Sequence, residues 1–293
     1  MKGASSTARL IAACIVLQDE RGIAERWLPV TTIALSRATL RSSGVPGRVL
    51  LAALGVSWIR KFFVAFERQL QPGMLAHFLL RKHCIANWAE QAITAGASQI
   101  LILGAGMDGL GPELCQRHAG LQVVELDHPA TQAVKRRALE QVAPGTRTRL
   151  LAIDLSGADL HRQIDATRLS REGPTLVVAE GLLMYLLPRN CLRLLEVIAG
   201  HFHGRLDVVF SVMENDSRGR PGFTRAHPLI DHWLSWRGEP FRWACDPARL
   251  AKVLERAGLR VQAMHRGDEL PTAEFPDWSP CIGETLYFAS RSD

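Results

Sequence analysis

The stretch ILILGAGMDGLGPEL, residues 100–114, carries residue types suited to holding a nucleotide-like ligand. Four apolar residues lead into Gly104, Gly106 and Gly109, which have the spacing G-x-G-x-x-G. Glycines let a backbone turn approach a ligand closely, and the free amides at the start of the following helix face that ligand. One carboxylate, Asp108, lies inside the turn. The stretch therefore predicts a strand, a binding turn and a helix.

Carboxylates also lie at the ends of the strands predicted after this turn. Glu125 and Asp127 follow the turn by about 20 residues, where an acidic residue binds the ribose hydroxyls of a dinucleotide. Asp154 ends the third predicted strand, where it can accept a hydrogen bond from an adenine amino group. Glu180 ends the fourth. These acids are expected at one edge of the sheet.

The acids favour S-adenosylmethionine over a dinucleotide as the ligand. Asp108 would face two phosphates unfavourably, but it is compatible with a ligand that carries positive sulfonium and ammonium groups. The glycine spacing by itself fits a pyrophosphate equally well. An NAD(P)-dependent oxidoreductase therefore stays as the alternative.

Short apolar runs alternate with helical patterns from residue 99 onward, as is typical of βαβ units. Strands are predicted at 99–103, 121–126, 148–153, 175–180 and 206–212. Helices are predicted between them at 109–118, 129–141, 157–169 and 189–201. A capped helix ending at Gly258 and two further strands close the chain. The predicted fold class is α/β, with a parallel sheet covered on both faces.

Residues 1–95 show helical patterns and no strand pattern, so we expect a helical N-terminal cap followed by a ligand-binding domain at 96–293. The segment 213–246 is rich in Arg, Gly, Pro and Trp and follows the carboxyl end of a strand, where open α/β sheets bind ligands. We interpret it as a lid-like insertion. Its arginines either hold an anionic substrate or lie exposed on a loop; they are Arg218, Arg220 and Arg225.

Composition limits the class of protein. The 293-residue chain has a net charge of +6 but only two tyrosines and 6% aromatic residues. Nucleic-acid binding needs a basic stripe with interleaved aromatics, so no nucleic-acid partner is expected. Six cysteines without a C-x-x-C pair predict reduced thiols in a cytoplasmic protein and no metal site.

Two apolar stretches, 10–17 and 49–58, are shorter than the roughly 20 residues that span a bilayer. Both are interpreted as helices packed on a core. Membrane contact is not expected, although the sequence leaves open whether residues 49–66 touch a membrane surface.

Four motifs in this order and spacing resemble the leucine carboxyl methyltransferase family, including its bacterial branch of polyketide-type O-methyltransferases: ILILGAGMDG, VVELDHPATQAVK, AIDL and VVAEGLLMYL. PGMLAHFLLRKHCI, residues 72–85, is similar to the arginine-bearing helix of this family. The resemblance implies a Rossmann-like class I methyltransferase fold. In that fold a seven-stranded, mostly parallel sheet has an antiparallel last strand and carries a helical N-terminal cap.

The resemblance also implies S-adenosyl-L-methionine as cofactor and assigns residues to it. The implied cofactor-binding residues are Arg81, Gly104, Ala105, Gly106, Asp108, Glu125, Asp127, Asp154, Leu155 and Glu180. Arg81 would pair with the methionine carboxylate, and Asp127, with Glu125 beside it, would hold the ribose hydroxyls. Asp154 and Leu155 would flank the adenine.

Glu180 and Tyr185 would lie near the methyl-transfer cleft, which makes them the candidate catalytic residues. The predicted activity is that of an S-adenosylmethionine-dependent O-methyltransferase acting on a carboxylate or hydroxyl of a small metabolite. An anionic acceptor is consistent with the positive net charge.

A carboxylate acceptor is already ionised at neutral pH, whereas a hydroxyl needs a general base. Candidate bases are His201, His203, His227, His232 and His265. Where family members commonly have Asp-Thr-Arg after the glycine turn, this chain has D-G-L-G-P-E-L. That departure keeps a non-catalytic S-adenosylmethionine-binding protein as a further alternative.

Overall fold

The computed structural model describes residues 4–155, 159–270 and 280–291. Within them lies a seven-stranded sheet of order β3-β2-β1-β4-β5-β7-β6. Its strands are β1 Gln99–Leu103, β2 Gln122–Asp127, β3 Arg149–Ala152, β4 Thr175–Ala179, β5 Leu206–Met213, β6 Arg260–Arg266 and β7 Glu284–Arg291. β1 to β5 are parallel, and β7 pairs antiparallel with both β5 and β6. The predicted fold class is confirmed, and the five predicted strands agree with the observed ones to within one residue at each end.

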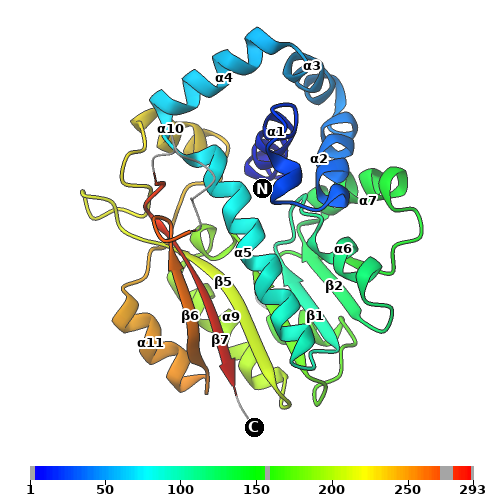
Figure 1. The fold of residues 1–293 in the computed structure, drawn as a ribbon. Coiled ribbons are helices and arrows are strands. Elements are labelled where there is room, and N and C mark those ends of the chain that lie inside the picture. The colour runs from blue at the N-terminus through cyan, green and yellow to red at the C-terminus, as the bar shows by residue number, and fades with distance from the viewer. Residues whose placement is uncertain (1–3, 156–158, 271–279, 292–293) are drawn as a thin grey trace.

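Helices lie beyond the strand ends and on both faces of the sheet (Figure 1). They are α1 Ser6–Asp19, α2 Val30–Ser42, α3 Gly44–Leu54, α4 Ser57–Leu70, α5 Met74–Thr94, α6 Leu110–Arg117, α7 Pro129–Val142, α8 Leu160–Asp165, α9 Pro188–His201, α10 Pro228–Trp236 and α11 Pro247–Arg256, with short 3-10 turns η1 Ala24–Arg26 and η2 Leu183–Tyr185. The helix predicted at 157–169 is shorter than expected, and its first two residues lie outside the described residues.

The central strand β1 explains why apolar runs predict this sheet. All five of its residues are buried. Ile100 and Ile102 belong to one buried cluster with residues of α5 and α6, whereas Leu101 and Leu103 belong to another with residues of α8, α9 and α11. Alternate side chains of a strand point to opposite faces. A strand covered by helices on both faces therefore needs apolar residues throughout.

The helices α1 to α4 lie beyond the carboxyl ends of the parallel strands (Figure 1). Helix α5 runs from this region onto the sheet, where Leu80, Ile85 and Trp88 are buried together with β1. The helical segment predicted for residues 1–95 thus ends in α5, a helix that packs directly on the sheet. In the described part of the chain, no single helix is long and apolar enough to span a membrane. Only α3 and α4 taken together reach that length and apolar character, and the chain is strongly bent between these two helices.

Candidate active site

The glycine turn joins β1 to α6 at the carboxyl edge of the sheet. Gly104 and Gly106 have φ of 63° and 53°, the left-handed region that favours glycine. A Cβ on Gly104 would also lie 2.8 Å from Cδ1 of Leu182. Gly109 has a different reason to be glycine, because a Cβ there would lie 2.5 Å from Oγ1 of Thr32 in α2. Gly104 and Gly106 therefore shape the turn, and Gly109 allows α2 to pack against it.

Asp127, the last residue of β2, is held rigidly beside this turn. Its Oδ2 accepts a hydrogen bond from the Gly106 amide at 2.5 Å, and its Oδ1 accepts one from the His128 amide at 2.6 Å. Burial raises the pKa of Asp127, and the two amide hydrogen bonds oppose this rise. A carboxylate offers about four lone-pair sites. Asp127 therefore retains capacity to accept hydrogen bonds from two hydroxyls of a ligand in the adjoining cavity, which it lines.

Glu125 does not join Asp127 at the cavity, so the prediction that it binds the cofactor is not supported. Its side chain is fully buried and forms an ion pair with Lys135 of α7, which is equally buried. A Cβ on Gly111 of α6 would lie 2.3 Å from the Oε1 atom of Glu125. Glu125 and Asp127 share one face of β2, but Glu125 lies two residues deeper, beneath α6 and α7. Its position indicates a structural role.

We expect Glu125→Gln to lower stability while leaving the affinity for S-adenosylhomocysteine within about threefold of the wild type. Removing one partner of a buried ion pair costs about 3–5 kcal/mol because it leaves a buried charge uncompensated. Thermal unfolding and isothermal titration of the same preparation measure both effects. In the double variant with Lys135→Met, part of the lost stability should return. A loss of ligand affinity at normal stability would contradict this assignment.

A buried network of charges connects α5 to the strand ends. Arg81 donates from Nε to Glu180 at 2.9 Å and from Nη1 to Glu284 at 2.8 Å. Lys82 pairs with Asp108 at 3.0 Å and with Glu180 at 3.1 Å. We call these five residues the charged cluster. It brings together the glycine turn, the end of β4 and the start of β7, and all five line the cavity.

The charged cluster contains two cations and three carboxylates. Burial works to raise the pKa of Asp108, but the ammonium groups of Lys82 and Lys135 hold it below its usual range. Burial likewise works to raise the pKa of Glu284, but Arg81 and the hydrogen bond that Glu284 accepts from His77 hold it well below its usual range. Asp108 and Glu284 therefore stay ionised at neutral pH. By formal charge, the three carboxylates outnumber the two cations, so the cluster has one surplus negative charge.

One cavity of about 810 Å³ opens at this edge of the sheet. Most of the predicted site residues line it: Arg81, Gly104, Ala105, Gly106, Asp108, Asp127, Asp154, Leu155, Glu180 and Tyr185. Tyr185 packs against Phe241 with ring centroids 5.6 Å apart. Burial raises the pKa of Tyr185 well above its usual range, so its hydroxyl keeps its proton at neutral pH.

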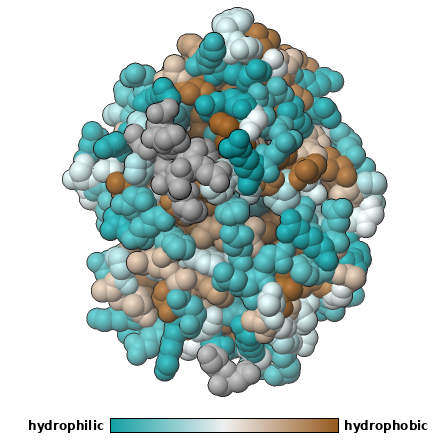
Figure 2. All heavy atoms as spheres, viewed as in Figure 1, coloured by the Kyte–Doolittle hydropathy of each residue, from teal (hydrophilic) through white to brown (hydrophobic). Residues whose placement is uncertain are grey.

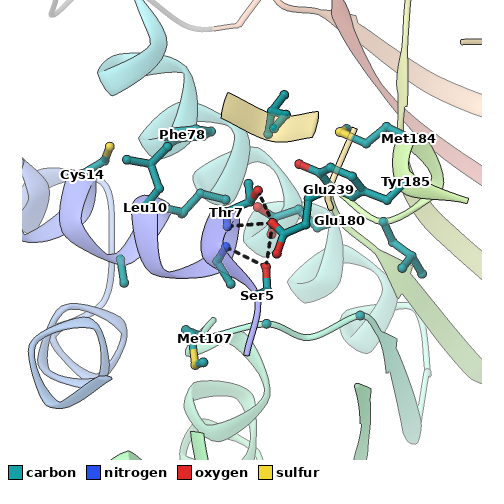
Figure 3. Close-up of a pocket in the computed structure, with 18 of the residues that line it drawn as sticks. Ser5, Thr7, Leu10, Cys14, Phe78, Met107, Glu180, Met184, Tyr185 and Glu239 are labelled. Atoms are coloured by element: carbon teal, nitrogen blue, oxygen red, sulfur yellow. Dashed lines mark hydrogen bonds between the residues drawn. The ribbon is translucent and has the colours of Figure 1, made fainter. Parts of the chain in front are cut away.

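The start of α1 is anchored across the cavity by Glu239 (Figure 3). The Glu239 carboxylate accepts hydrogen bonds from the backbone amides of Ser6 at 2.7 Å and Thr7 at 2.9 Å. The Thr7 hydroxyl donates to it as well, at 2.5 Å. A carboxylate at a helix N-terminus satisfies amides that have no partner within the helix. The N-terminal helix and the segment 213–246 are thereby joined over the cavity.

The three arginines proposed to hold an anionic substrate do not line the cavity. Arg218, Arg220 and Arg225 are exposed, and Arg220 lies near Asp216 and Asp231. The segment 213–246 instead turns apolar side chains toward the cavity; they include Phe223, Leu229, Ile230, Trp233, Leu234 and Phe241. Side chains of this segment thus line the cavity, whereas its three arginines lie exposed, which is the second of the two alternatives for them.

The five candidate base histidines lie elsewhere. His201 packs on Phe202, His265 stacks on Trp88, and His227 caps the start of α10. His203 lies near Glu172, and none of the five, His232 included, is among the described residues that line the cavity. Their role as general bases is therefore not supported.

The sequence reasoning missed four residues of the site: His77, Lys82, Glu239 and Glu284. Lys82 follows the predicted Arg81 directly, so its presence in LLRKH was an available signal. Glu284 begins the final strand, and an antiparallel strand starts at the edge where its parallel neighbours end. No local signal marks His77 or Glu239. In the described residues, no group of three or more His, Cys, Asp or Glu side chains could hold a metal ion.

Comparisons with known proteins agree with this architecture. A DUF574 family protein from Streptomyces avermitilis superposes with a TM-score of 0.59 at 17% identity, covering 80% of this chain and 90% of that one. Magnesium protoporphyrin IX methyltransferase from Synechocystis, crystallised with SAH, superposes with a TM-score of 0.51 at 14% identity, covering 81% and 88%. At such identities the likeness establishes the fold, which is the Rossmann-like class I methyltransferase fold.

The sequence model of leucine carboxyl methyltransferases matches residues 48–199. The chain therefore belongs to the leucine carboxyl methyltransferase family, whose methyl donor is S-adenosylmethionine. A protein of Mycolicibacterium smegmatis assigned as an S-adenosyl-L-methionine-dependent methyltransferase is 32% identical over 202 residues, 58% of this chain. In that relative and in another from Mycobacterium avium, the match spans 62–63% of the relative's length. The NAD(P) alternative is not favoured by this family membership.

Proposed function

We propose that the protein is an S-adenosylmethionine-dependent O-methyltransferase that acts on a carboxylate or hydroxyl of a small metabolite. The observation that carries the proposal is the charged cluster beside Asp127. S-adenosylmethionine carries a sulfonium, an ammonium and a carboxylate, a net charge of one positive. The surplus negative charge of the cluster complements that ligand, because opposite charges attract strongly where water is excluded.

The residues present fit each part of the donor. Asp127 would accept hydrogen bonds from the ribose hydroxyls, and Asp154 and Leu155 would flank the adenine. Arg81 uses Nε and Nη1 for its two carboxylates, and we assign its third nitrogen, Nη2, to the methionine carboxylate. Glu180 is the carboxylate that both cations share, so it is suited to receive the ligand's ammonium group.

When bound, S-adenosylmethionine supplies a methyl group on a positively charged sulfur. The protein's part is to align the acceptor and to exclude water. The α1 helix, anchored by Glu239, covers the cavity and serves the second task. A carboxylate acceptor needs no base, which agrees with the absence of the five candidate histidines from the described cavity lining. The six unpaired cysteines support a reducing, cytoplasmic setting.

Tyr185 is assigned to orient the acceptor by donating a hydrogen bond to its oxygen. We expect Tyr185→Phe to lower the methyl-transfer rate by about 10- to 100-fold, since one preorganised donor is lost. Affinity for S-adenosylhomocysteine should stay within about twofold. Tyr287→Phe, at the other tyrosine of the chain, is the matched control because Tyr287 stacks on Phe210 in the sheet. Equal rates for Tyr185→Phe and wild type would remove Tyr185 from the mechanism.

Transfer of tritium from labelled S-adenosylmethionine to a panel of carboxylic acids, phenols, alcohols and amines tests the function. A methyl ester releases volatile methanol in base, whereas a methyl ether does not, so base treatment separates the two O-methylated products. We expect one of them. Transfer to an amine alone would contradict O-methylation, and cofactor binding without transfer to any acceptor would favour the non-catalytic alternative.

A further inference from the structure

The cavity continues well beyond the charged cluster into an apolar half. Four helices line this half: α1, α4, α5 and α10. Its walls include Leu10, Cys14, Phe66, Phe78, Ile230 and Trp233. Figure 3 shows Leu10, Cys14 and Phe78 on one side of the Ser5, Thr7 and Glu239 hydrogen bonds, with Tyr185 and Met184 on the other. The apolar half thus begins beside Tyr185, the residue proposed to orient the methyl acceptor, and leads away from it.

Most of these walls are apolar, and Glu67 and Gln71 at the end of α4 are the polar side chains among them. Burial and the nearby Glu67 carboxylate raise the pKa of Cys14 to about 12, so the thiol is neutral. Protein cores tolerate few voids larger than a water molecule, so a mainly apolar hollow of this size is suited to holding a ligand. Single-ligand pockets measure about 300–1,000 Å³. A cavity near the upper end of that range has room for a second, apolar occupant beside the donor.

The apolar half opens to solvent at a mouth that is itself apolar. Leu10, Phe66 and Leu229 line the cavity and are nevertheless 44%, 49% and 58% exposed. On the same helix as Phe66, Trp58 and Phe62 are more exposed still, and Phe62 stacks on Phe66. Figure 2 shows hydrophobic residues among hydrophilic ones over α3 and α4. Leu10, Phe66 and Leu229 therefore give an apolar molecule an apolar surface along which to enter.

We infer that the acceptor is an amphiphile with an extended hydrocarbon tail and a terminal carboxylate or hydroxyl. Its polar end would lie by Tyr185, and its tail would occupy the apolar half between α1, α4 and α10. This inference rests on the proposed methyl transfer and narrows its acceptor to a class of lipid-like molecules. Burial of the tail supplies the affinity, and the polar end sets the orientation.

The test is a chain-length series on the full protein saturated with S-adenosylhomocysteine. Straight-chain carboxylic acids of about six to about twelve carbons are titrated by calorimetry. Affinity should rise about fourfold per added methylene, the gain expected for full burial of each group, until the tail fills the cavity. Affinity that is independent of chain length would overturn the inference.

Leu10→Trp supplies the second arm of the test. A larger side chain at the mouth should make the rise stop at a shorter chain and lower affinity for the longest acid by about tenfold or more. Val49→Trp is the matched control, because Val49 is 63% exposed on α3 and does not line the cavity. Unchanged chain-length dependence in Leu10→Trp would overturn the assigned route. Failure of S-adenosylhomocysteine to bind the wild type would instead refute the proposed function, while the acids alone still test the apolar half.

Discussion

Replacing Asp127 with alanine is expected to weaken the binding of S-adenosylhomocysteine by at least about 100-fold. Each hydrogen bond from a ligand to a charged group contributes about 1.5–3 kcal/mol, and Asp127 can accept two from ribose hydroxyls. Its carboxylate is fixed in advance by the amides of Gly106 and His128, so little conformational freedom is lost on binding. Calorimetric titration measures the loss directly.

The Asp127→Ala variant also leaves those two amides without their partner, so its fold has to be verified. Circular dichroism and a thermal melt of the same sample serve this purpose, and titration below the melting temperature keeps the comparison valid. Asp165→Ala is the matched control, because Asp165 is exposed at the end of α8 and pairs with Arg171 on the surface. Wild-type affinity in a folded Asp127→Ala protein would count heavily against the assigned ribose site.

Replacing Arg81 with methionine is expected to destabilise the protein by about 3–5 kcal/mol at pH 8. Arg81 is the cation that compensates Glu284, whose side chain is completely buried. After the replacement, Glu284 still accepts the hydrogen bonds from His77 and Ser211 but has lost the positive charge of Arg81. Urea unfolding of both proteins at several pH values measures the difference.

The pH dependence of this difference has a definite sign. In the wild type the pKa of Glu284 is lowered, so its contribution to stability is complete above the unfolded-state pKa, about 4.3, and is lost only in stronger acid. In Arg81→Met, burial should raise the pKa of Glu284 above the unfolded value, and the folded state then gains protons as the pH falls. The stability deficit should therefore shrink between pH 8 and pH 5.

Two further variants separate this electrostatic account from a loss of packing. Arg81→Met combined with Glu284→Gln should recover much of the lost stability and remove the pH dependence. Arg117→Met is the surface control, because Arg117 is 50% exposed and its ion pairs with Glu90 and Glu113 should contribute at most about 1 kcal/mol. A deficit that does not change with pH would show that packing of the Arg81 side chain dominates.

The sequence predicts the fold well because its signals are local. Unbroken apolar runs such as QILIL identify strands covered on both faces, and Pro129 and Pro188 mark helix starts at the places where α7 and α9 begin. The spaced glycines predict the turn after β1, where Gly104 and Gly106 have positive φ. Asp127 is predictable for the same reason, since it ends a recognisable strand.

Apart from Lys82, the parts of the site that escaped prediction depend on pairings between distant segments. Glu125 has the same strand periodicity as Asp127, and only the position of Lys135 on α7 makes it a buried structural residue. Glu284 meets Arg81 across 203 positions, and Glu239 meets the start of α1 across more than 230. Such contacts follow from the packing of the whole chain and leave no periodic signal.

Isothermal titration of the wild-type protein with S-adenosylhomocysteine, NAD and NADP distinguishes a methyl-donor site from a dinucleotide site. We expect micromolar binding of S-adenosylhomocysteine and no binding of either dinucleotide, because the surplus carboxylate of the charged cluster complements an ammonium and repels a pyrophosphate. Binding of NAD or NADP, with no binding of S-adenosylhomocysteine, would contradict this expectation.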